Sequence, residues 1–180
     1  MTQKAESFPI GDHHSRTGGK LACYAQAPNH ADYAGCSASR RRLAGPRRRS
    51  RGRGISEEKD YPVESALVSG EMRGWRAADP GTQTIRLIFD QPQRLGRISL
   101  VFEENEIKRT QEFVLRWSPD GGRSFRDIVR QQWNFSPPDT VREVEEYQVE
   151  LSDVTALELI IVPNNSGGAA RASLKSLRLS

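Results

Sequence analysis

The chain has 180 residues, of which 36% are hydrophobic and 28% charged, and its formal net charge is +4. No stretch approaches the roughly 18 consecutive apolar residues that a membrane helix needs, and residues 1–15 contain no apolar core of a secretory signal. Two cysteines, Cys23 and Cys36, are too few for a disulfide-rich scaffold. We therefore expect a soluble, cytoplasmic protein of about one domain.

The charge divides the chain into two parts. Residues 1–55 hold eleven Lys and Arg against three Asp and Glu, whereas residues 56–180 hold sixteen against twenty. Residues 40–54 are rich in Arg and Gly and show no apolar periodicity. Repulsion between like charges predicts a disordered basic N-terminal segment over residues 1–55. Such an arm would bind nucleic acid only nonspecifically, because no aromatic residues are interleaved for base stacking.

All three histidines and both cysteines lie in this basic segment, but their spacing does not fit a zinc site. Zinc takes four ligands, usually from two close pairs such as C-x2-C and H-x3-H. The two cysteines are thirteen positions apart, and the one close pair is the adjacent His13 and His14. We predict no metal site and no cofactor.

From residue 56 onward, apolar and polar residues alternate with the period of half-buried β-strands. Turn signals rich in Pro, Gly, Asn and Asp separate these runs, and no amphipathic helix of about 12 residues lies between them. The predicted strands cover 82–90, 94–104, 111–118, 125–133, 144–151, 157–163 and 174–179. The pattern indicates an all-β domain over residues 56–180, an antiparallel sandwich or barrel. Its expected core consists of Ile85, Leu87, Phe89, Ile98, Leu100, Phe113, Leu115, Trp117, Leu159 and Ile161.

Several motifs in residues 61–180 occur in the order found in a known family. The run A-L-V-S-G at 66–70 precedes Trp75, F-D-Q-P-Q at 89–93 ends a strand, and S-P-D-G-G-R-S-F at 118–125 forms the most specific motif. Together they resemble the discoidin, or coagulation factor 5/8 type C, module of the galactose-binding-like jelly rolls. The resemblance implies a jelly-roll sandwich that holds ligands on loops at one end.

The resemblance assigns the ligand to two loops, residues 73–76 and 103–109. Sugars need an aromatic face for their C–H surface and Arg, Asn or carboxylate groups for vicinal hydroxyls, and these loops offer both. The candidate ligand-binding residues are Arg73, Trp75, Arg76, Glu106, Lys108 and Arg109. Two alternatives stay open: Trp75 is a core residue that closes the barrel end, and the charged side chains are ordinary solvated surface.

Residues 56–180 contain no His and no Cys, which excludes a Ser-His-Asp triad and a thiolate nucleophile from this domain. Its carboxylates cluster within single segments, whereas a glycosidase needs two carboxyl groups facing each other across a cleft. The sequence therefore predicts a protein that is not an enzyme, and first of all a carbohydrate-binding module. The alternatives are a protein-interaction module that uses the same loops and, third, a nucleic-acid binder that uses the basic arm.

Overall fold

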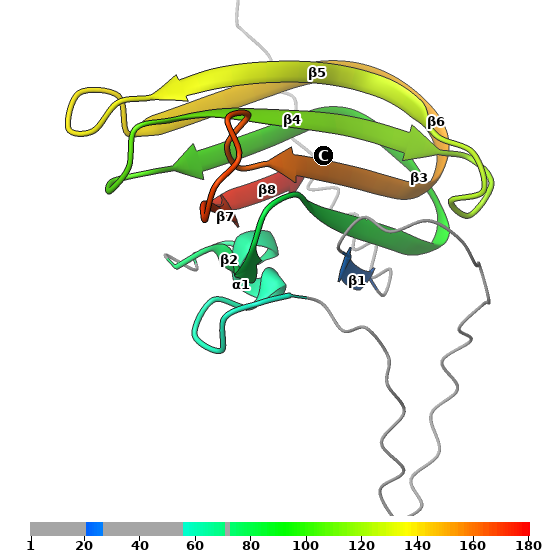
Figure 1. Cartoon of the computed structure of the whole chain (residues 1–180). Helices are drawn as coiled ribbons and strands as arrows, with labels where there is room; N and C mark the ends of the chain where they lie inside the picture. The colour runs from blue at the N-terminus through cyan, green and yellow to red at the C-terminus, as the bar shows by residue number, and fades with distance from the viewer. Residues whose placement is uncertain (1–20, 27–55, 71–72) are drawn as a thin grey trace, which may run out of the picture.

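The structure is a computed structural model that describes residues 21–26, 56–70 and 73–180 (Figure 1). Every strand pairing in it is antiparallel. The elements in chain order are β1 (Leu21–Gln26), α1 (Val63–Leu67), β2 (Trp75–Pro80), β3 (Gln83–Glu103), β4 (Arg109–Ser118), β5 (Arg126–Phe135), β6 (Arg142–Val162), β7 (Arg171–Leu174) and β8 (Ser176–Leu179). The predicted all-β antiparallel sandwich is confirmed.

Two long strands, β3 and β6, bend together and take part in both layers of the sandwich. The first half of β3 pairs with the second half of β6, in a layer that also contains β1, β4 and β5. The second half of β3 pairs with the first half of β6 and with β8. The register shifts around Pro92, which has no N–H to donate, and close to Asp153, whose φ is +59°. The sequence predicted two separate strands in place of each long strand. In β3 the prediction was wrong because Pro92 interrupts the ladder of hydrogen bonds without ending the extended backbone.

The core lies between the two layers and consists of inward-facing apolar side chains. Eight of the ten predicted core residues are buried, whereas Phe89 and Trp117 are partly buried and pack against the core. Phe102 and Phe113 meet across the sandwich with their ring centroids 5.1 Å apart. Trp75 and Phe135 are also buried, each with 1% of its surface exposed. The period-2 pattern thus identified the correct face of the strands in both layers.

The strand β1 lies inside the basic segment for which no regular structure was expected. It pairs with β3 from Leu21 opposite Phe89 to Gln26 opposite Thr84. An edge strand of this kind needs only backbone hydrogen bonds, so it requires no long apolar alternation in the sequence. The rest of residues 1–55, with the arginine-rich run, lies outside the described residues. The domain division at residues 55 and 56 stays a prediction.

The turn at residues 118–125, the most specific motif of the sequence, is built around Asp120. The Asp120 carboxylate accepts hydrogen bonds from the hydroxyls of Ser118 and Ser124, each at 2.6 Å, and from the Ser124 N–H at 2.9 Å. These bonds hold the pKa of Asp120 well below its usual range, because they stabilise the charged carboxylate. The motif therefore encodes a stable hairpin connection between β4 and β5.

Candidate ligand-binding site

A two-stranded sheet of β2 and β7 closes one end of the sandwich and forms the floor of the candidate site. Trp75 pairs with Leu174, and Arg76 pairs with Ser173. Successive side chains of a strand point to opposite faces, so Trp75 and Leu174 enter the core while Arg76 and Ser173 face outward. The outward-facing polar residues of β2 and β7, such as Arg76 and Ser173, thereby share one outer surface although they are more than ninety residues apart in the sequence.

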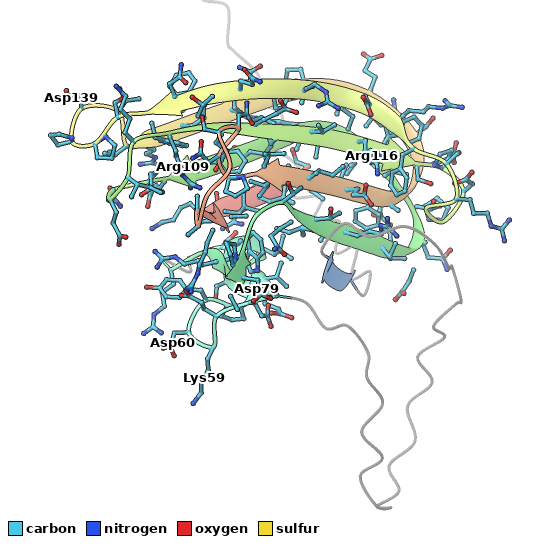
Figure 2. All side chains as sticks on the ribbon, in the orientation of Figure 1. Lys59, Asp60, Asp79, Arg109, Arg116 and Asp139 are labelled. Carbon is cyan, nitrogen blue, oxygen red and sulfur yellow. The ribbon has the colours of Figure 1, made fainter. Side chains whose placement is uncertain are left out.

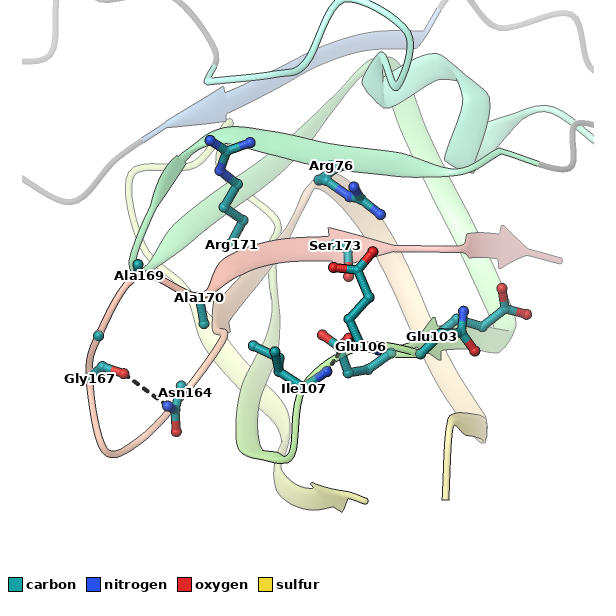
Figure 3. Close-up of a pocket in the computed structure, with 13 residues that line it drawn as sticks. Arg76, Glu103, Glu106, Ile107, Asn164, Gly167, Ala169, Ala170, Arg171 and Ser173 are labelled. Atoms are coloured by element: carbon teal, nitrogen blue, oxygen red, sulfur yellow. Dashed lines mark hydrogen bonds between the residues drawn. The ribbon is translucent and has the colours of Figure 1, made fainter. Parts of the chain in front are cut away.

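Two loops rise on either side of this floor and enclose an open depression of about 530 Å³. One loop joins β3 to β4, and the other joins β6 to β7 (Figure 3). In Figure 3, Arg76 and Arg171 lie on one side of the depression, and Glu106 and Ile107 lie on the facing loop. The lining also includes Glu103, Glu104, Asn105, Asn164, Gly167, Gly168, Ala169, Ala170 and Ser173.

A smaller depression of about 300 Å³ adjoins the first one. The two share the side chains of Arg76, Glu103, Asn105 and Ser173. The remaining lining of the smaller depression comes from Tyr61, Arg73, Trp75, Leu174 and Lys175. We refer to the larger space as the first depression and to the smaller one as the second depression.

A buried ion pair between Glu104 and Arg109 fixes the shape of both loops. Arg109 Nε lies 2.9 Å from Glu104 Oε2, and the Arg109 Nη1 donates hydrogen bonds to the carbonyls of Pro163 and Arg171, each at 3.0 Å. The other Glu104 oxygen accepts the N–H groups of Glu106 at 2.8 Å and Ile107 at 3.2 Å. One arginine therefore connects the start of β4 with both ends of the second loop. Figure 2 shows Arg109 and Arg116 at opposite ends of β4.

Arg109 is 4% exposed, and this burial lowers its pKa while Glu104 acts in the opposite direction. A buried guanidinium needs compensation for its lost hydration, which the carboxylate and the two carbonyls provide. Because all these partners belong to the protein, Arg109 shapes the site from below. It does not present its charge to the depression.

Arg76 and Arg171 supply the cationic groups that face the first depression. Arg76 stacks over the Tyr61 ring at 4.9 Å and lies 3.9 Å from Glu58, while Arg171 forms an ion pair with the same carboxylate. Their side chains remain 43% and 48% exposed, so both can donate to a ligand. On the opposite side, Glu106 is exposed and takes part in no ion pair within the described ranges.

The structure brings only some of the predicted ligand-binding residues together. Arg76 lines both depressions, Glu106 lines the first, and Arg73 lines the second. Lys108 is exposed but lines neither depression. Arg109, expected as a ligand contact, is instead the buried support described above.

Trp75, which was expected either to contact a sugar or to close the end of the barrel, is buried and offers no exposed ring for stacking. Only 1% of its surface is exposed, because the outward face of β2 belongs to Arg76 and the inward face to Trp75 and Ala77. Its ring is part of the hydrophobic core cluster. The alternative, in which Trp75 closes the end of the barrel, matches this burial.

Arg171, Ser173 and Lys175 were not predicted as site residues, yet all three line the depressions. A signal for them was present, since these three polar residues alternate with the buried Ala172 and Leu174. That alternation covers only a few residues, too few to distinguish a short strand from a loop. The meeting of β7 with β2 is a long-range contact that local patterns do not reveal.

The carboxylates of the site come from the end of β3 and the loop that follows it, and two of the three are already in ion pairs. Glu104 pairs with Arg109, and Glu103 lies 2.9 Å from Lys175 Nζ. Within the described part of the chain, no group of three or more His, Cys, Asp or Glu is arranged to hold a metal ion. None of the helices in residues 56–70 and 73–180 is long and apolar enough to cross a membrane.

Comparison with solved structures identifies the fold. A family 32 carbohydrate-binding module from Clostridium perfringens, solved with GalNAc-β-1,3-galactose, is 19% identical with a TM-score of 0.51, and the match covers 69% of this chain and 89% of that one. A GH29 fucosidase from Ruminococcus gnavus, solved with fucose, is 8% identical with a TM-score of 0.50, over 67% of this chain and 22% of that one. The N-terminal domain of the single-strand break repair protein XRCC1 is 14% identical with a TM-score of 0.49, over 69% and 90%.

No family model matches the sequence, and no curated protein matches it. At the identities given above, the likeness to the solved structures is one of fold. The described β-sandwich has the galactose-binding-like, discoidin-type fold, as the motifs of the sequence predicted.

Proposed function

We propose that this chain is a non-catalytic carbohydrate-binding module and that a sugar occupies the first depression above the β2–β7 sheet. The main support is the chemistry of its lining. Arg76 and Arg171 donate from one side, Glu106 accepts from the other, and Asn105 and Ser173 can do both. Vicinal sugar hydroxyls need donors and acceptors that converge in this way. The fold is shared with a module whose structure contains GalNAc-β-1,3-galactose.

Binding in this site depends on hydrogen bonds more than on stacking. The two aromatic residues near the floor are Trp75, which is buried, and Tyr61, which is half-buried beneath the Arg76 guanidinium. Each hydrogen bond in an open depression competes with water. We therefore expect weak affinity for a single sugar unit, with a dissociation constant of about 10 μM to 1 mM.

The test is a titration of the isotopically labelled full chain with neutral monosaccharides, followed by NMR. Galactose, N-acetylgalactosamine, fucose and glucose serve as probes, at concentrations up to tens of millimolar. The expected result is a saturable shift of the backbone amides of Asn105, Glu106 and Ser173 for at least one sugar. Shifts elsewhere on the molecule, without these three, would contradict the assigned site.

Arg76→Ala and Arg97→Ala form a matched pair for this experiment. Arg97 is 47% exposed and pairs with one carboxylate, Glu146, at 2.5 Å, so it resembles Arg76 in exposure and charge. It precedes Glu103 by six residues on β3, which corresponds to roughly 20 Å along a strand. Arg76→Ala should abolish the sugar-induced shifts, whereas Arg97→Ala should leave them unchanged.

The second candidate is a protein-interaction module that uses the same end of the sandwich. The observation in its favour is Ile107, which is 44% exposed on the rim of the first depression. An apolar side chain on a polar rim suits a protein surface better than a sugar. If none of the monosaccharides moves any amide at tens of millimolar, the carbohydrate proposal falls and this candidate takes its place.

A further inference from the structure

We propose that the second depression binds an anionic substituent of the sugar, a carboxylate or a sulfate ester, so that the module prefers acidic glycans. This inference rests on the proposed carbohydrate function and specifies its substrate class. The two depressions are adjacent and share Arg76, Glu103, Asn105 and Ser173. A sugar ring in the first depression would therefore place a substituent in the second.

The two depressions differ in charge. The second depression is lined by three cations, Arg73, Arg76 and Lys175, and by one carboxylate, Glu103. Two further charges lie close by: Glu58, 3.9 Å from Arg76, and Arg142, 4.0 Å from Glu103, and these offset each other. Among the residues that the structure describes, the second depression thus has an excess of positive charge.

The first depression is lined by three carboxylates, Glu103, Glu104 and Glu106, and by the two arginines Arg76 and Arg171. Lys175 pairs with Glu103 and Arg109 pairs with Glu104, so the charge of Glu106 decides how an anion is received. An anionic group placed there would meet the exposed carboxylate of Glu106, which forms no ion pair with the described part of the chain. Neutral hydroxyls face no such penalty. Electrostatics therefore orients an acidic sugar in one way, with its ring hydroxyls toward Glu106 and its anionic group toward Arg73 and Lys175.

The cations are brought together by a close contact between two backbone segments. Gly74 has a φ of +73°, and a Cβ at this position would lie 2.6 Å from the Leu174 carbonyl oxygen. Only glycine fits such an approach without displacement, so Arg73 and Lys175 flank a fixed crossing point. The Lys175 N–H also donates to the Val101 carbonyl at 2.8 Å, which fixes its backbone. The backbone positions that carry these two charges are therefore fixed before any ligand arrives.

Lys175 forms an ion pair with Glu103 and still has N–H donors for a ligand. Its Nζ lies 2.9 Å from Glu103 Oε2, and 30% of the side chain is exposed. An ammonium group has three donors, so two remain for an anion after the bond to Glu103. Partial burial also reduces screening by solvent, which strengthens its attraction for a ligand charge.

The test compares three sugars that share one ring: galactose, galacturonate and galactose 6-sulfate. Their affinities for the full chain are measured by NMR titration at low ionic strength and again at 0.5 M NaCl. We expect at least one acidic sugar to bind about fivefold more tightly than galactose, as one or two partly exposed ion pairs allow. The advantage should shrink at high salt. The two acidic probes show whether the preferred group is a carboxylate or a sulfate.

Variants locate the effect through the ratio of acidic to neutral affinity. Arg73→Gln and Lys175→Met should each reduce this ratio, and the double variant should bring it close to one. Glu103→Gln should raise it, because the substitution removes a carboxylate that lines the second depression and pairs with Lys175. Arg97→Gln is the control, since it removes the same net charge from a distant exposed position and should leave the ratio unchanged.

The affinities of the three sugars and of the variants distinguish failure of the anionic subsite from failure of the carbohydrate function. If galactose binds and neither acidic sugar binds more tightly, the anionic subsite is refuted and the carbohydrate function stands. If an acidic sugar is preferred but Arg73→Gln and Lys175→Met leave the ratio unchanged, the subsite is also refuted. If no sugar binds at all, both proposals fail together.

Discussion

Replacing Trp75 by alanine distinguishes a core residue from a ligand platform. A tryptophan side chain buries about 200 Å², which at about 25 cal/mol per Å² gives an upper estimate near 5 kcal/mol. Trp75 is 1% exposed, and its Nε1 has no hydrogen-bond partner in the described structure, so truncation removes packing without breaking a hydrogen bond. We expect Trp75→Ala to lower the free energy of unfolding by about 3 to 5 kcal/mol, as for other large aromatic truncations.

Urea unfolding followed by circular dichroism measures this loss, with an unchanged m-value as the sign that the two end states are preserved. The thermal midpoint should fall by about 10 to 20 °C for a domain of this size. Since the loss is a large part of a typical domain stability, Trp75→Phe provides a milder variant that should cost about 1 to 2 kcal/mol. Arg76→Ala should cost no more than about 1 kcal/mol, because its contacts with Tyr61 and Glu58 are partly exposed to solvent.

A loss of less than about 1 kcal/mol for Trp75→Ala, together with the disappearance of sugar binding, would contradict a core role for Trp75. That result would mean that the ring contacts the ligand and that the strand β2 presents its other face to solvent. The reverse pattern, with stability lost at Trp75 and binding lost at Arg76, supports the site as described.

Three further perturbations test the backbone, the buried charge and the N-terminal strand. Gly74→Ala should cost about 2 kcal/mol or more in urea unfolding, and more than Gly121→Ala, since both glycines have positive φ but only Gly74 meets another backbone. Burial raises the pKa of Glu143 to about 8, with repulsion from Glu145 adding to it. The folded state then retains a proton that the unfolded state loses above about pH 4.5, so stability should fall between pH 4.5 and 8 and then level off. Glu143→Gln should flatten this slope in urea midpoints measured from pH 5 to 8, and an unchanged slope would assign it to other groups. Deleting residues 1–26 removes β1 and should lower the thermal midpoint below that of a chain lacking only residues 1–20, whereas equal midpoints would show that β1 adds no stability.

The strands predicted correctly from the sequence are those in which apolar and polar residues alternate over several two-residue repeats. In β4, Phe113 and Leu115 stand two residues apart and both are buried. The prediction failed where a single residue was taken as the end of a strand, as at Pro92, since proline removes one hydrogen bond without preventing an extended backbone. It also missed β2 and β7, which have six and four residues. So few residues do not establish a period.

The candidate site was only half predictable for a related reason. The loop residues 73–76 and 103–109 entered through the resemblance to discoidin modules, but the role of Arg109 did not. A charged side chain is expected at the surface, and its partners Pro163 and Arg171 bind it through main-chain carbonyls. Such carbonyls are present at every position of a sequence, so no pattern of residue types predicts this pairing.

The Glu104–Arg109 pair has a consequence for how this surface can change over evolution or in the laboratory. The pair holds the two loops through backbone N–H and carbonyl groups, as well as through its own ion pair. The side chains at neighbouring positions such as Asn105, Glu106 and Ser173 are therefore not needed to maintain the shape of the loops. Their side chains can be exchanged while the backbone beneath them stays in register. A library randomised at these three positions, with Glu104 and Arg109 kept, should yield folded variants at high frequency and allow the ligand preference to be redirected on an unchanged frame.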